Sequence, residues 1–347
     1  MTHGGDSDPR AELRAYLASE GVPAEIIAEY DERGWLTSAG ADAVLHGARV
    51  YTTDEAATRA RISPDAFEQA FQAAGLAVPD RDVKAWSDED VSLMFAFGAA
   101  AELFGLPAML QFARVLGASL ARVAEASVAN FLVNVEAPLR QTHPEDDIEL
   151  ARVNTLAVNM LMEVPHLSIA MFRRHVLAAQ VRTRTSREAA FDTFRLAVGF
   201  LDLVGYTELS GRLATSDLAA AVEDFERDAV AVIASSGGRL VKSIGDALMF
   251  VAQSPEAACQ AALELCEHVS EHPVLTQLRG AVAFGNLLGR DGDYYGPTVN
   301  LAARALPLAP AGAIVTDRPV DGLRSESLGP QQLRSITEAV ELWVVRR

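Results

Sequence analysis

Cysteine is scarce in this sequence, since the 347 residues include only Cys259 and Cys266. Both fall on one expected helix, where seven residues correspond to about 10 Å of axial rise, too far for a disulfide bond. The first ten residues are polar and acidic, so we expect no secretory signal there. These features lead us to expect a cytoplasmic protein without disulfide bonds.

Basic residues are also few. Lys and Arg number 30 against 47 Asp and Glu, which gives a formal net charge of −17. Proteins that bind nucleic acids gain much of their affinity from Lys and Arg that neutralise phosphates, so we expect no nucleic-acid partner. An anionic substrate would need local basic groups or metal ions to offset the overall negative field.

Long uninterrupted apolar runs are absent as well. The most apolar stretch, residues 91–110, is broken by Ser92, Glu102 and Pro107. A membrane-spanning helix needs about 20 predominantly apolar residues, so the sequence predicts no membrane span.

The chain is long enough for two domains. Residues 1–182 show helical apolar spacing almost throughout and predict an all-helical domain. Residues 193–347 alternate strand and helix patterns, which predicts an α+β domain with a largely antiparallel sheet. Between them, residues 183–192 are polar and basic; they are expected to form a linker or to extend the preceding helix.

The stretch from Tyr51 to Phe71 resembles a helix-turn-helix. Thr53 and Ser63 are expected N-caps, and Pro64 stands at a first helical position. The second helix offers no Arg, Lys or Asn for contacts with base edges. We therefore interpret the two helices as a packing pair and not as a DNA reader.

Three further helices of the first half are long and apolar on more than one face, over residues 87–98, 106–130 and 148–180. Such helices belong in a bundle core or against another domain. Their methionines are adaptable packing residues that could also contact lipid. Histidines are the groups that titrate near neutral pH; His166 and His175 lie on the last of these helices, and His143 lies just before it.

In the second half, two aspartates stand beside expected strands. Asp246 follows Gly245 at the tip of an expected hairpin over residues 240–250, and Asp202 ends an expected strand over residues 196–201. Taken alone, Asp246 could simply form the turn. If the two strands are neighbours, the carboxylates converge and can hold two hard divalent cations, which clamp a phosphate during in-line displacement.

Asn300 and Arg304 form a second candidate pair. They are four residues apart on an expected helix over residues 298–305, so they project from the same face. An amide and a guanidinium placed in this way can grip a polyphosphate and offset charge in a transition state. The alternative is a capping Asn and a solvated Arg.

Together these segments resemble the catalytic domain of class III nucleotide cyclases, over residues 195–347. The resemblance implies a ferredoxin-like or palm-like antiparallel sheet with helices. It assigns Asp202 and Asp246 as metal ligands for two Mg²⁺ or Mn²⁺ ions, and Lys242 and Asp293 as the pair that selects adenine. A Lys donor suits N1 of adenine and an Asp acceptor suits its amine, which favours ATP over GTP.

The same resemblance implies that Asn300 and Arg304 stabilise the transition state. The ribose 3′-hydroxyl would attack the α-phosphorus with the assistance of two metal ions, releasing pyrophosphate and cyclic AMP. Active sites of this family lie at a head-to-tail dimer interface. Because this chain carries both sets of residues, a homodimer is expected, with Asp202 and Asp246 from one protomer and the other four residues from its partner.

The helical half resembles the regulatory domain of soluble actinobacterial, notably mycobacterial, adenylyl cyclases. This implies an autoinhibitory module, which in some relatives responds to pH. A lipid or another small effector is a candidate partner of this domain. The alternative function is a non-catalytic nucleotide- or lipid-binding signalling module on a cyclase scaffold.

Overall fold

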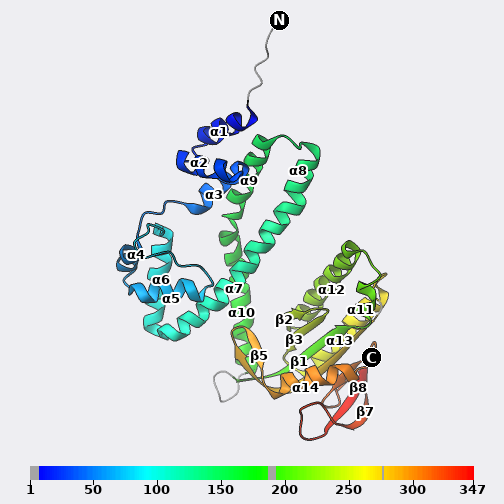
Figure 1. Cartoon of the computed structure of the whole chain (residues 1–347). Helices are drawn as coiled ribbons and strands as arrows, with labels where there is room; N and C mark the ends of the chain where they lie inside the picture. The colour runs from blue at the N-terminus through cyan, green and yellow to red at the C-terminus, as the bar shows by residue number, and fades with distance from the viewer. Residues whose placement is uncertain (1–7, 187–192, 276) are drawn as a thin grey trace. The chain divides into compact units, whose positions relative to one another are not determined.

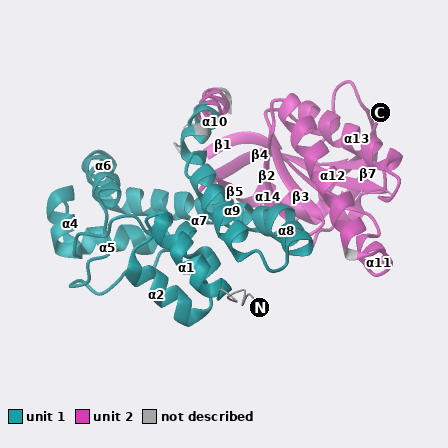
Figure 2. Ribbon diagram, turned by 90° about the horizontal axis from the view of Figure 1, so that it is seen from above, with its two compact units in different colours: residues 1–173 teal, residues 174–347 magenta. Residues whose placement is uncertain are grey.

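The computed structural model describes residues 8–186, 193–275 and 277–347. The chain divides into two compact units, Met1–Arg173 and Arg174–Arg347 (Figure 2). The boundary falls inside one helix, α10 (Val164–Ser186). Residues 183–186 of the expected linker thus belong to the end of α10, and residues 187–192 lie outside the described part of the chain.

Unit 1 is helical in its described part (Figure 1). Its helices are α1 (Pro9–Ser19), α2 (Ala24–Arg33), α3 (Ala39–His46), α4 (Thr53–Ala60), α5 (Pro64–Ala73), α6 (Asp88–Phe104), α7 (Leu106–Phe131), α8 (Ala137–Thr142), α9 (Asp147–Leu161) and the first part of α10. A 3-10 turn at Leu36–Ser38 precedes α3, and a π-helical turn at Leu132–Glu136 joins α7 to α8. The single helix expected over residues 148–180 is two helices, separated at residues 162–163.

The α4–α5 pair packs through its apolar face, as expected. Phe67 and Phe71 of α5 are buried against Trp86, whose ring centroid lies 4.9 Å and 4.5 Å from theirs. Ser63 caps α5, but the expected cap of α4 was wrong. The cap is Thr52, because Glu55 stands three residues later and closes a capping box with it. The neighbouring Thr53 is buried instead and accepts a hydrogen bond from the Trp86 indole.

The longest helices of unit 1 leave many apolar side chains exposed, and α7 buries none of its residues. By length and composition alone, two segments could cross a membrane, Leu106–Thr142 and Asp147–Arg184. The core helices of soluble proteins can be equally long and apolar, but they are mostly buried. The most apolar stretches of these two segments are 0% buried. The absence of a membrane span therefore stays a prediction.

Unit 2 is the expected α+β domain. The described strands are β1 (Thr193–Leu203), β2 (Arg239–Ile244), β3 (Ala247–Ala252), β4 (Leu278–Arg290), β5 (Asp293–Tyr295), β6 (Ile314–Thr316), β7 (Arg324–Gln331) and β8 (Val340–Arg346). They form one sheet in the order β2-β3-β1-β4-β6-β8-β7, with β5 paired to β4. Only the β4–β6 pairing is parallel among the described pairs, which confirms the largely antiparallel sheet.

Helices cover both faces of this sheet. They are α11 (Tyr206–Ser210), α12 (Thr215–Ser235), α13 (Pro255–Glu271) and α14 (Pro297–Ala305). The residues of α12 and α13 share a buried cluster with one face, and α14 shares another with the opposite face. The N-cap position of α12 is Ala214, with no side-chain hydrogen bond.

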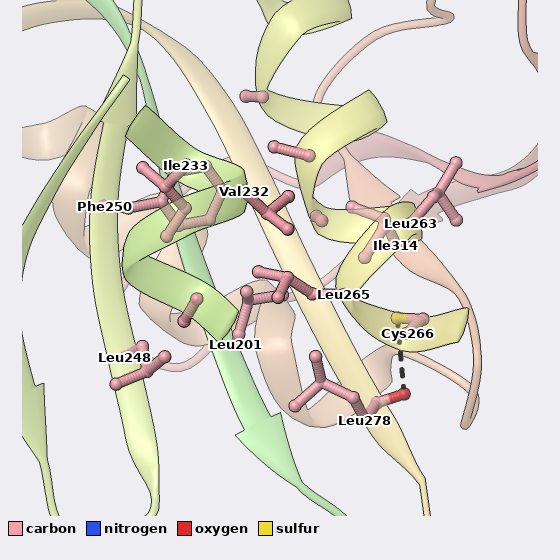
Figure 3. Packing of buried hydrophobic residues seen from close by; sticks show 14 of the residues in the cluster. Leu201, Val232, Ile233, Leu248, Phe250, Leu263, Leu265, Cys266, Leu278 and Ile314 are labelled. Atoms are coloured by element: carbon pink, nitrogen blue, oxygen red, sulfur yellow. Dashed lines mark hydrogen bonds between the residues drawn. The ribbon is translucent and has the colours of Figure 1, made fainter. Parts of the chain in front are cut away.

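Figure 3 shows the core between α12, α13 and the sheet. Leu201 and Phe250 from neighbouring strands meet Ile233 of α12, and all three are fully buried. Cys266 of α13 donates a weak hydrogen bond to the carbonyl of Leu278 at 3.7 Å. Both cysteines are free, and both are also buried, which raises the pKa of each thiol to about 12. These thiols are therefore packing groups.

Candidate active site

The β2–β3 hairpin brings the two candidate metal ligands to one end of the sheet. Gly245 adopts φ 63°, the left-handed conformation that a tight turn requires, and Asp246 follows it. Strand β1 pairs with β3 so that Asp202 lies opposite Ala247, the residue after Asp246. The two strands are therefore neighbours, which is the condition under which the two carboxylates were expected to converge.

The two carboxylates influence each other. Burial, together with the negative charge of Asp202, raises the pKa of Asp246, while the nearby Arg279 opposes this effect. Two like charges at a half-buried rim repel, and a divalent cation between them would relieve that repulsion. Mg²⁺ is commonly held by one or two carboxylates together with substrate phosphates, so this oxygen donor set fits such an ion. Among the described residues, no cluster of three or more His, Cys, Asp or Glu forms a metal cage.

Arg279 is a functional candidate that the sequence did not reveal. It lies opposite Asp202 in the β1–β4 ladder, and its guanidinium donates two hydrogen bonds to one Asp202 oxygen at 2.9 and 2.6 Å. Arg279 and its partner Asp202 are 77 residues apart in the sequence. Only the sheet register identifies it.

Lys242 and Asp293 are brought together. The Lys242 ammonium lies 2.5 Å from one carboxylate oxygen of Asp293, and the backbone N–H of Tyr294 donates to the other oxygen at 2.8 Å. Asp293 follows a tight two-residue turn at Asp291 and Gly292, which have φ 57° and 78°. This pattern is that of a type I′ hairpin, whose Asp-Gly sequence suits it. A donor and an acceptor thus stand side by side, with Lys242 largely exposed.

Asn300 and Arg304 lie on α14 and line the same cavity of about 430 Å³, as their spacing predicted. Phe284 from β4 and Asp317 from the segment after β6 are among the other residues of its wall. Pro297 begins the helix after Gly296, whose φ of 126° few other residues adopt. The amide and the guanidinium therefore line one open cavity.

These candidates form three separate groups. In the part of the chain that the structure describes, no hydrogen bond or ion pair connects the Asp202–Asp246–Arg279 group with the Lys242–Asp293 pair or with the Asn300–Arg304 cavity. One chain holds a carboxylate group, a donor–acceptor pair and a cavity lined by Asn300 and Arg304, and the described hydrogen bonds and ion pairs do not link the three groups.

The chain is similar in sequence to several known proteins. The family described as the adenylate and guanylate cyclase catalytic domain matches residues 192–335. An adenylate cyclase of Streptomyces coelicolor is 32% identical over 278 residues, covering 79% of this chain and 71% of that protein. An uncharacterized protein of Mycobacterium tuberculosis is 32% identical over 308 residues, covering 88% of this chain and 81% of that protein.

A third relative is named a pH-sensitive adenylate cyclase of Mycobacterium tuberculosis. It is 30% identical over 254 residues, covering 67% of this chain and 62% of that protein. Residues 193–347 are too few to hold alignments of this length. The similarity to all three relatives therefore extends well into the helical unit.

Proposed function

Because the chain belongs to the adenylate and guanylate cyclase family, we propose that it converts ATP into 3′,5′-cyclic AMP and pyrophosphate. The observation that carries the choice of ATP is the contact between Lys242 and Asp293. An ammonium can donate to N1 of adenine, and a carboxylate can accept from its exocyclic amine. The corresponding edge of guanine has the reverse donor and acceptor pattern, so the same pair would leave it unsatisfied.

In this reaction the ribose 3′ oxygen forms a bond to the α-phosphorus, and the bond between the α-phosphorus and the oxygen that bridges to the β-phosphate breaks. Pyrophosphate leaves with that electron pair, and the hydroxyl proton passes to water. Asp202 and Asp246 would hold two divalent cations, Mg²⁺ or Mn²⁺. Such ions, when bound, lower the pKa of the attacking hydroxyl and neutralise the triphosphate. Arg304 and Asn300 would donate hydrogen bonds to oxygens that gain negative charge at the phosphorus. Arg279, beside Asp202, is placed to bind phosphate oxygens that approach the same rim.

We further propose a head-to-tail homodimer as the active species. The three separate groups of one chain support it, because a two-fold axis can bring the carboxylates of one protomer to the other two groups of its partner. Both sets are present in every chain, so each dimer would hold two equivalent sites. Lys242 and Asp246, only four residues apart, would then serve different sites.

The test of catalysis is a product assay with purified full-length protein. We expect cyclic AMP from ATP with Mn²⁺ or Mg²⁺, at a kcat/KM at least about a hundredfold above that for cyclic GMP from GTP, because the base-reading groups would be mispaired with guanine. Removal of the cations with EDTA is expected to abolish turnover, and added Mn²⁺ to restore it. Absence of product with every divalent cation would instead support a non-catalytic nucleotide- or lipid-binding module.

Unit 1 is proposed to regulate this activity. It contains an apolar cavity of about 540 Å³ between α5, α6 and α7, a size typical of small-molecule sites. Phe71, Met94, Phe97, Met109 and Phe112 are among its walls. We propose a lipid acyl chain as its ligand. The pH-sensitive relative named above supports a second input, a response to protons.

The regulatory prediction compares the full chain with a shortened chain that begins near residue 187. We expect the shortened chain to be at least about fivefold more active, because it lacks the inhibitory unit. The ratio of the two activities should vary between about pH 5.5 and 8, where histidine titrates. Vesicles or micelles of a fatty acid should change only the activity of the full chain. Equal activities at every pH, with equal responses to lipid, would exclude regulation by unit 1.

A further inference from the structure

Strands β2 and β5 carry the two members of the adenine-reading pair, yet they are not hydrogen-bonded neighbours. Strand β2 is the edge strand beside β3, and β5 pairs with β4. In the described part of the chain, two side chains of β2 bridge this gap. Lys242 reaches the carboxylate of Asp293, and Arg239 donates a hydrogen bond to the carbonyl of Gly292 at 2.6 Å. The relative position of the pair therefore depends on side chains and not on a strand ladder.

Arg239 contacts the chain on both sides of Asp293. The Gly292 carbonyl belongs to the peptide that precedes Asp293, and the Arg239 guanidinium also lies 5.3 Å from the ring centroid of Tyr294, the residue that follows. The backbone N–H of Tyr294 in turn fixes the second oxygen of Asp293. A guanidinium on an aromatic face and a charge-assisted hydrogen bond both resist displacement of the hairpin.

The Tyr294 ring is fixed from two further directions. Phe194 of β1 contacts it edge-on, with ring centroids 6.2 Å apart and planes at 90°. Arg182, near the end of α10, hydrogen-bonds the Tyr294 side chain. Burial, with the neighbouring positive charge of Arg239, lowers the pKa of Arg182. The Arg239 guanidinium lies over the same Tyr294 ring. The hairpin that carries Asp293 is thus anchored through Tyr294.

We propose that Arg239 is a positioning residue that sets the base selectivity of the enzyme, by holding Asp293 at the distance from Lys242 that adenine requires. This inference rests on the proposed adenylate cyclase activity and on the role of the Lys242–Asp293 pair. Arg239 does not need to touch the nucleotide. It acts on the peptide before Asp293 and on the ring after it.

The experiment measures kcat and KM for ATP and for GTP in full-length Arg239→Ala. A lost hydrogen bond from a charged donor corresponds to about a tenfold change or more, so we expect the ATP-to-GTP ratio of kcat/KM to fall about tenfold. The loss should appear mainly as a higher KM for ATP, because the cavity of Asn300 and Arg304 is left intact. Arg239→Lys keeps one donor for the Gly292 carbonyl and should recover part of the selectivity.

Arg290→Ala is the matched control. Arg290 lies on the same hairpin, opposite Asp293, but it is exposed and its ion pair is with Asp291 at 3.7 Å. Its removal deletes the same charge from the same hairpin, and selectivity should not change. A loss caused by charge alone would appear in both variants and would contradict the positioning role.

A second arm separates positioning from a general structural effect. In an Asp293→Ala background, Arg239→Ala should cause no further loss of selectivity, because the acceptor that it positions is gone. Selectivity that is unchanged in Arg239→Ala, with wild-type cyclic AMP formation, would overturn this inference alone. A wild-type chain without cyclase activity would overturn the proposed function. If Arg239→Ala does not fold, Arg239→Lys and Arg239→Gln are measured in its place. Wild-type KM values and wild-type selectivity in both of these variants would contradict the proposal.

Discussion

Replacement of Asp246 by asparagine is expected to abolish cyclic AMP formation, with a fall in kcat of at least about a thousandfold. Asn keeps the size and the turn preference of Asp, so the hairpin after Gly245 should persist. It removes the negative charge that a divalent cation needs, and metal ions contribute several kcal/mol to transition-state stabilisation, each 1.36 kcal/mol being a factor of ten in rate. Product assays at saturating ATP and Mn²⁺ measure the effect.

The pH dependence of the wild-type chain should agree with this result. Because burial and Asp202 raise the pKa of Asp246, protons compete with the cation at a higher pH than for an ordinary aspartate. Activity should fall as the pH is lowered toward that pKa, and added metal should offset the fall.

Asp321→Asn is the matched control for Asp246→Asn. Asp321 is also an aspartate beside a turn glycine, but it is exposed and lies far along the chain. Full activity in Asp246→Asn would end its assignment as a metal ligand.

A mixture of two inactive chains is expected to regain activity. Asp246→Asn and Arg304→Ala should each be inactive as homodimers. In a mixed head-to-tail dimer one site receives both substitutions, while the other receives an intact Asp246 from one protomer and an intact Arg304 from its partner. With random pairing, half of the dimers are mixed and each has one working site, so about a quarter of wild-type activity should return.

The control for this experiment mixes Asp246→Asn with Asp202→Asn. Both residues would come from the same protomer in each site, so every site in a mixed dimer lacks one metal ligand and no activity should return. Recovery in this control, or no recovery in the first mixture when mixed dimers are present, would contradict the shared site. The composition of the mixtures can be measured with two different affinity tags.

Local features of the site could be predicted because they depend on a few neighbouring residues. The Gly245–Asp246 turn between two apolar strands needs only short-range chemistry, and so does the common face of Asn300 and Arg304 on one helix. The contact between Lys242 and Asp293 was expected from the family resemblance alone, since 51 residues separate them.

Features that depend on the register of the sheet were missed. Arg279 becomes significant only when β1 and β4 pair with Asp202 opposite it. Strand β7 was not predicted, because an edge strand of mostly exposed residues that contains Gly329 and Pro330 lacks an apolar alternation. The wrong N-cap of α4, Thr53 in place of Thr52, had another cause. Glu55 stands three residues after Thr52, so the capping-box pattern was already present in the sequence.

Helix α10 is one continuous element of 23 residues that begins in unit 1 and ends in unit 2. At 1.5 Å per residue it extends over about 35 Å, and its backbone hydrogen bonds resist both stretching and untwisting. A rotation of its first turns about the helix axis would therefore reach Arg182 as an angular displacement with little change in length. Arg182 contacts Tyr294, next to Asp293. Under the proposed regulation, the signal that α10 would carry from unit 1 to the hairpin of Asp293 is then torsion, that is, a change in the angle of the helix about its own axis.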